Sequence, residues 1–162
     1  MKVLSTVLAL SLVISAPIIS LLPPMQAAQA QTQPSVATIE ASAFKQVNDY
    51  RVSQGLAPLQ QVSYISDVAR QHSANMASGA VAFGHDGFSA RVTQIRTQMT
   101  VSAAAENVAY NQGYSDPATT AVQGWLNSSG HLANIRGNYT KAGLGVAVNS
   151  KGEYYFTQIF IR

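Results

Sequence analysis

The chain has 162 residues, a formal net charge of +3 at pH 7 and no cysteine. The lack of cysteine excludes disulfides, thiolate metal ligands, a cysteine nucleophile and a lipid anchor attached through an N-terminal thiol. The basic residues are scattered along the sequence, which argues against nucleic acid as a partner because a nucleic-acid surface needs clustered Lys and Arg.

The first thirty residues have the pattern of a secretory leader. Lys2 precedes an apolar run from about Val3 to Leu22, and Ala28-Gln29-Ala30 is a small-residue cleavage site. We therefore predict a signal peptide over residues 1–30 and a secreted protein, extracellular or periplasmic, with no stable membrane insertion after cleavage. A retained N-terminal anchor is the alternative, because the apolar run is close to the roughly 20 residues that span a bilayer.

The rest of the chain divides into a linker and one domain. Residues 31–40 begin with a polar stretch that contains Pro34 and lacks periodicity, so they are assigned to a short disordered linker. Residues 41–162 form the predicted domain, and the roughly 130 residues left after cleavage are enough for one domain that buries about two thirds of its unfolded surface. An exported domain without disulfides has to be stabilised by its own core.

Two helices open the domain. From Ile39 to Ser53 the apolar positions recur at helical spacing, and Gly55 supplies a left-handed stop. A clearer three-four pattern runs from Val62 to about Ser78, where Gly79 ends the second helix. His72 lies on the apolar face of this second helix, which favours an imidazole that is hydrogen-bonded within the core over a ligand role.

The middle of the chain mixes loop, helix and strand. Residues 79–87 are predicted as loop, Phe88–Gln98 as a weaker helix with Val92 and Ile95 facing inward, and 106–110 as a short strand. In that strand Glu106 lies on one face and Asn107 on the other. Asp116 before Pro117 is a strong helix start, and the apolar stripe that follows ends near Ser128-Ser129-Gly130. His131 is therefore expected just beyond a helix end.

The last third changes to twofold alternation. Residues 144–148 and 155–161 are predicted strands joined by a hairpin loop at Asn149–Gly152, and no internal repeat is present. Helices, then a strand, a helix and a terminal hairpin indicate an α+β layered domain.

With these elements in place, the chain resembles the CAP superfamily, named for cysteine-rich secretory proteins, antigen 5 and pathogenesis-related proteins, and in particular its bacterial SCP-like branch. The resemblance runs from about Phe44 to Ile161 and is specific because six motifs occur in the same order. The motifs are Asn48-Asp49-Tyr50-Arg51 with Gly55-Leu56-Ala57-Pro58-Leu59, Ala69–His72, Gly84-His85, Glu106-Asn107-Val108-Ala109, Gly124-Trp125 with Gly130-His131, and Gly143-Leu144-Gly145-Val146 before Tyr155-Phe156-Thr157-Gln158.

The resemblance implies a three-layer α-β-α sandwich with a central antiparallel sheet and a cleft lined by two histidines and two acidic residues, which in some members hold zinc. Carried over by position, these are His85, Glu106 and His131. The second acidic residue is missing, because Asn127 and Ser128 stand in its region.

Two chemistries fit this set of residues. His85, His131 and Glu106 could ligate a divalent metal such as zinc and leave one position open, or they could form a metal-free polar network that shapes the cleft. The predicted ligand-binding cleft contains these three residues with Asn107 and Ser128. Trp125 has the phase of its apolar neighbours, which favours a core position over a place in the ligand groove.

The leading hypothesis is a monomeric secreted binding module whose cleft takes a divalent cation, a small lipid-like ligand or a cell-envelope component. The alternative is a metal-assisted, peptidase-like hydrolase acting on peptide or envelope polymer, with Glu106 as base and His131 as the second catalytic group. A third possibility is an interaction domain that never uses its cleft. No serine-nucleophile motif supports a serine hydrolase.

Overall fold

The structure is a computed structural model, and it describes residues 34–162. Its elements are α1 (Val36–Ser53), β1 (Gln60–Gln61), α2 (Ser63–Ala77), α3 (Phe88–Arg96), β2 (Ala104–Gln112), α4 (Pro117–Leu126), α5 (Ser129–Arg136), β3 (Lys141–Val148) and β4 (Glu153–Ile161). The predicted signal peptide, residues 1–30, lies outside the described residues. Between residues 34 and 162 no helix has both the length and the apolar character needed to cross a bilayer.

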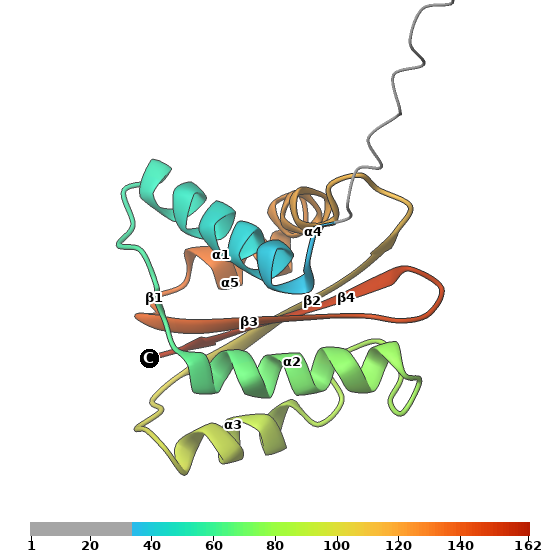
Figure 1. Cartoon of the computed structure of the whole chain (residues 1–162). Helices are drawn as coiled ribbons and strands as arrows, with labels where there is room; N and C mark the ends of the chain where they lie inside the picture. The colour runs from blue at the N-terminus through green and yellow to red at the C-terminus, as the bar shows by residue number, and fades with distance from the viewer. Residues whose placement is uncertain (1–33) are drawn as a thin grey trace, which may run out of the picture. The chain divides into compact units, whose positions relative to one another are not determined.

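One four-stranded sheet forms the middle of the domain, in the order β1-β3-β4-β2. β4 pairs antiparallel with both β3 and β2, and β1 adds a two-residue parallel pair to β3. Helices α1, α4 and α5 lie over one face of the sheet, and α2 and α3 lie over the other (Figure 1). The predicted α+β, three-layer sandwich is confirmed, and its sheet is antiparallel except at the short β1 segment.

Each face of the sheet carries its own apolar cluster. On the side of α1, α4 and α5, the large buried side chains are Trp125, Phe156 and Phe160. On the side of α2 and α3, Ile65 and Ile95 pack against the sheet. β4 contributes side chains to both clusters, because successive side chains of a strand point to opposite faces of the sheet.

The first helix begins earlier than the sequence analysis predicts. α1 starts at Val36, and the Ser35 hydroxyl caps it by accepting a hydrogen bond of 3.2 Å from the backbone N–H of Thr38. Ile39 and Glu40 are both buried. The assignment of residues 36–40 to a disordered linker is therefore wrong, because a serine cap and one buried turn extend the helix into a stretch of polar composition.

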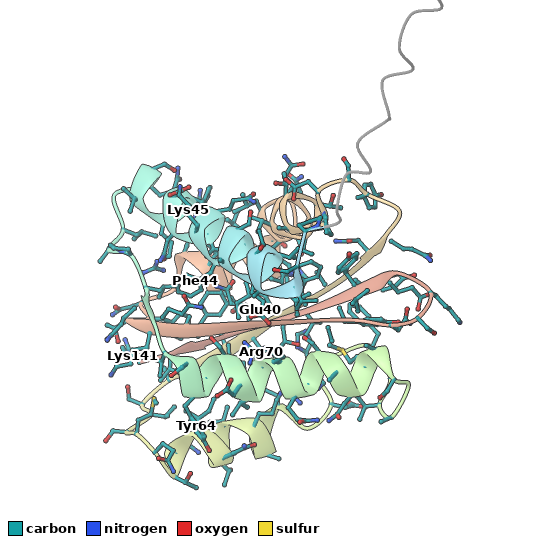
Figure 2. All side chains as sticks on the ribbon, viewed as in Figure 1. Glu40, Phe44, Lys45, Tyr64, Arg70 and Lys141 are labelled. Atoms are coloured by element: carbon teal, nitrogen blue, oxygen red, sulfur yellow. The ribbon has the colours of Figure 1, made fainter. Side chains whose placement is uncertain are left out.

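An ion pair links the two helix layers at the outer edge of β3. β1 covers this edge only at residues 141 and 142. Farther along, the Glu40 carboxylate of α1 accepts hydrogen bonds from the backbone N–H of Val146, at 2.9 Å, and from Nε and Nη2 of Arg70 of α2, both at 2.8 Å. Figure 2 labels Glu40 and Arg70 on opposite sides of the sheet. This carboxylate satisfies an edge donor and joins both layers.

A second buried charge, that of Arg51, holds two connecting segments of the chain together. The guanidinium of Arg51 donates to the carbonyl oxygens of Ala57, Ile135, Gly137 and Tyr139 over 2.6–3.3 Å. Burial lowers the pKa of this guanidinium. Arg51 thereby fixes the turn after α1 against the segment that joins α5 to β3.

Helix α2 lies unusually close to β3 because two positions of the strand have no side chain. A Cβ atom at Gly143 would lie 2.2 Å from the backbone nitrogen of Ser66, and one at Gly145 would lie 2.1 Å from that of Arg70. The Ser73 hydroxyl donates a 2.9 Å hydrogen bond to the carbonyl oxygen of Gly145. This approach fixes the distance between α2 and the sheet, and hence the position of His72.

We predict that Gly145→Ala destabilises the domain by about 3 kcal/mol, because backbone rather than a flexible side chain blocks the added methyl group. Gly124→Ala is the matched control: a Cβ at Gly124, inside α4, meets nothing within 4 Å. Relief of glycine's backbone entropy should make that variant more stable by about 0.5–1 kcal/mol. Urea unfolding of the two variants measures both effects, and equal stability of Gly145→Ala and the unsubstituted chain would contradict the packing argument.

Candidate functional site

The centre of the site is an arginine–glutamate–histidine network at the edge of the sheet. Glu106 lies on β2 with its side chain 1% exposed. Its Oε1 contacts Nη2 of Arg91 at 2.6 Å and Nδ1 of His85 at 3.0 Å, and its Oε2 accepts from Nε of Arg91 at 2.7 Å. Both carboxylate oxygens are therefore engaged by groups of the chain itself.

His85 and His72 join this network from different elements. His85 lies in the loop between α2 and α3, with its side chain 51% exposed. His72, on α2, contacts the carbonyl oxygen of Gly84 through Nε2 at 2.8 Å and Nη1 of Arg91 through Nδ1 at 3.1 Å. Because a guanidinium only donates, Nδ1 of His72 is the acceptor and Nε2 carries the proton. The predicted core position of His72 is confirmed.

Asn107 points to the opposite face of β2 and anchors α5. It is fully buried, and its Nδ2 donates to the carbonyl oxygen of His131 at 3.1 Å. Nδ2 of Asn134 donates to Oδ1 of Asn107 at 2.9 Å and to the carbonyl oxygen of Glu106 at 3.2 Å. Asn107 therefore lies beneath the site, where it orients the helix that carries His131, and does not form part of the cleft wall.

His131 lies inside a helix and not beyond a helix end. It is the third residue of α5, an element that the sequence analysis did not predict because Ser128-Ser129-Gly130 is typical of a helix terminus. Its Nδ1 atom is buried without a hydrogen-bond partner among the described residues. Burial, with a smaller contribution from the charge of His85, lowers the pKa of His131.

A groove of about 610 Å³ extends from His131 between β2 and α4. Its lining residues are Val108, Ala109, Tyr110, Asn111, Gln112, Tyr114, Thr120, Ala121, Gly124, Trp125, Ser128 and His131. Of the predicted cleft residues, Ser128 and His131 line this groove, whereas His85 and Glu106 are outside its lining.

Trp125 joins the two walls of the groove. Its indole N–H donates a 2.9 Å hydrogen bond to the carbonyl oxygen of Val108, and the residue is 1% exposed, so the predicted core position is confirmed. In Asn111, another lining residue, Oδ1 is buried without a hydrogen-bond partner among residues 34–162, whereas Nδ2 donates to the carbonyl oxygen of Pro117. The groove thus combines aromatic walls with unused hydrogen-bonding atoms.

Sequence reasoning missed Arg91 and the aromatic side chains beside the site. Arg91 lies three residues after Phe88 and four before Ile95, on the inward-facing stripe of its helix, and this phase was the signal that could have identified it. Phe83, Tyr110 and Tyr155 form an aromatic cluster with ring centroids 5.1–6.5 Å apart. The pairing of Tyr110 with Tyr155 depends on the register between β2 and β4, which sequence alone does not give.

The residues proposed as metal ligands do not form a cation site in this arrangement. Within residues 34–162 no group of three or more His, Asp or Glu side chains is placed to hold a metal ion. The carboxylate of Glu106 is shared by Arg91 and His85. Zinc ligation by His85, Glu106 and His131 is therefore not favoured by the geometry.

A family model matches most of the described domain. The model of the cysteine-rich secretory protein family, CAP, matches residues 44–160. A Bacillus subtilis protein named "Uncharacterized membrane protein YlbC" is 36% identical over 134 residues, which cover 76% of this chain and 36% of that protein.

Solved structures share the fold. An extracellular protein containing an SCP domain from Bacillus anthracis has 32% identity and a TM-score of 0.60, over 81% of this chain and 45% of that one. A cysteine-rich secretory protein from Staphylococcus aureus has 22% identity and a TM-score of 0.63, over 80% and 40%. An outer surface protein from Borrelia burgdorferi has 15% identity and a TM-score of 0.66, over 81% and 97%. The chain thus spans less than half the length of the two Bacillus proteins.

We predict that His72 makes the domain less stable in mild acid. Burial lowers the pKa of this imidazole below its usual 6.5. In acid the unfolded chain therefore takes up a proton that the folded chain does not, and stability falls as the pH drops below 6.5, by at most about 1.4 kcal/mol per pH unit for one such group. Urea unfolding at pH 7.5 and 5.5 should show a smaller loss for His72→Gln. His131 contributes with the same sign in both proteins, so an unchanged loss in the variant would rule out the role of His72.

Proposed function

The chain belongs to the cysteine-rich secretory protein family, CAP, and on that premise we propose that it is an extracellular binding module whose β2–α4 groove takes a small amphipathic ligand. The location is supported by the leader pattern of residues 1–30. It is also supported by the 32% identical Bacillus anthracis protein, which is described as extracellular. Attachment to a membrane is the other arrangement, since the Bacillus subtilis relative is named a membrane protein.

The groove between β2 and α4 is the observation that carries the proposal. Its volume of about 610 Å³ lies within the usual range of small-molecule sites, roughly 300–1,000 Å³. The exposed residue Tyr114 and the small side chain of Ala109 add apolar groups to its lining. A wall of this kind favours a ligand with one flat or aliphatic face.

The unpartnered atoms indicate the polar part of the ligand. Oδ1 of Asn111 can only accept a hydrogen bond, and Nδ1 of neutral His131 accepts when the proton is on Nε2. Ser128 adds a hydroxyl group to the same lining. A ligand that offers hydroxyl or amide N–H donors beside its apolar face would suit the Ser128 hydroxyl directly, and it would reach the two buried acceptors once the side chains of Asn111 and His131 turn toward the groove. Both a hydroxylated lipid and an amino-sugar fragment of the cell envelope have this chemistry.

A cation is not part of this proposal, and neither is hydrolysis. Metal-assisted hydrolysis would need the Glu106 carboxylate as a metal ligand or as a base, and Arg91 and His85 already occupy both of its oxygens. The binding role requires only groups that line the groove.

We predict that filling the groove abolishes binding. The side chain of Gly124→Phe, on α4, would enter open space in the groove lining. Calorimetric titration with two probes, monolaurin as the lipid and a soluble muropeptide as the envelope fragment, should show that one of them binds the unsubstituted chain. Gly124→Phe should weaken that binding at least tenfold, which is about 1.4 kcal/mol.

Two variants make this experiment specific. Gly124→Ala should bind like the unsubstituted chain, because a methyl group takes little of the volume. His131→Ala should weaken binding without blocking the groove, because it removes one hydrogen-bonding group. Failure of both probes to bind, or equal affinity of Gly124→Phe, would refute the proposal. The probe that binds decides between a lipid-like and an envelope ligand.

A further inference from the structure

The guanidinium of Arg91 is enclosed by acceptors from three segments of the chain: β2, the loop between α2 and α3, and α2. Its Nε and Nη2 contact the two oxygens of Glu106 at 2.7 and 2.6 Å, and Nη2 also approaches the carbonyl oxygen of His85 at 3.4 Å. Its Nη1 donates to the carbonyl oxygen of Asp86 at 2.8 Å and to Nδ1 of His72 at 3.1 Å. A guanidinium has five N–H groups, and each has an acceptor here.

We propose that Arg91 is the resident cation of this site: its guanidinium occupies the Glu106 oxygens that a divalent metal ion would need, and the site is metal-independent for that reason. This inference concerns the residues behind the groove and does not depend on what the groove binds.

Burial makes the arginine–glutamate pair difficult to exchange. The side chain of Glu106 is 1% exposed and that of Arg91 is 11% exposed. A carboxylate at such depth requires a hydrogen-bonded counter-charge, because its water shell has been removed. The bidentate contact with Arg91 supplies that charge in the geometry that matches a carboxylate best. A metal ion that bound Glu106 would compete with the guanidinium for these oxygens.

Charge also opposes a second cation. A positive ion there would gain little net attraction, because the guanidinium already neutralises the carboxylate. The remaining candidate donors do not compensate, since Nδ1 of His72 accepts from Arg91 and Nδ1 of His85 is bonded to Glu106. The pair of Arg91 and Glu106 is neutral as a whole. The site therefore suits an uncharged ligand better than a divalent ion.

Zinc titration tests the first half of this proposal. Isothermal calorimetry of the unsubstituted chain and of Glu106→Gln should give the same zinc isotherm, because Glu106 takes no part in any zinc binding. If the unsubstituted chain binds zinc with a Kd below about 10 µM and Glu106→Gln weakens that binding at least tenfold, Glu106 is a metal ligand and the proposal is overturned.

Chemical rescue tests the second half. Arg91→Ala should lower the Tm, and millimolar methylguanidinium should restore part of the loss by entering the vacated position. Arg96→Ala is the matched control, since Arg96 lies on the same helix and is exposed, and it should show neither effect. A Tm of Arg91→Ala that methylguanidinium does not raise above the response of the control would contradict a cation-binding position.

A double variant keeps the test decisive if Arg91→Ala does not fold. Arg91→Ala combined with Glu106→Gln leaves no unpaired charge buried at this site, so it should fold with a higher Tm than Arg91→Ala alone. A double variant that is no more stable than the single variant would show that Arg91 acts by packing and not as the counter-charge of Glu106, which would overturn the proposal.

Discussion

The carboxylate of Glu40 holds the two helix layers of this domain together across the outer edge of β3. It accepts hydrogen bonds from the Val146 backbone and from Arg70, so one side chain both satisfies an edge donor and pairs with a charge on the opposite layer. An open edge would invite pairing with another strand. The close approach of α2 to β3 is compatible with this contact only because Gly145 has no side chain. The position of α2, and hence of His72 in the site, depends on both conditions.

At the other edge of the sheet, side chains of α4 and α5 donate hydrogen bonds to β2, and these contacts shape the site. The carbonyl oxygens of Glu106 and Val108 on β2 accept from Asn134 and Trp125. These bonds hold α4 and α5 beside the strand and leave the groove between them. The carboxylate of Glu106 points to the opposite layer, where Arg91 neutralises it. The same strand thus borders the groove on one side and carries a buried ion pair on the other.

Local sequence signals predicted the parts of this fold that depend on local structure. Residues 62–78 had helical periodicity and a glycine stop, and the structure has α2 there. The start of α1 and the whole of α5 were missed, because polar residues hid a serine-capped turn and Ser128-Ser129-Gly130 suggested a terminus. The family resemblance implied that His85 and Glu106 lie together, and in the structure they are in hydrogen-bond contact. It gave no indication of Arg91: the helical phase of Arg91 marks it as inward-facing, but the identity of its partner on β2 depends on three-dimensional packing.

The position of Trp125 gives the protein an optical property. It is the chain's single tryptophan, it forms part of the groove wall, and its indole is bonded to the strand on the far side of that groove. The intrinsic fluorescence of this indole therefore originates at one known place. A shift of its emission maximum reports locally on whether the groove is filled or whether α4 has separated from β2, without any added label.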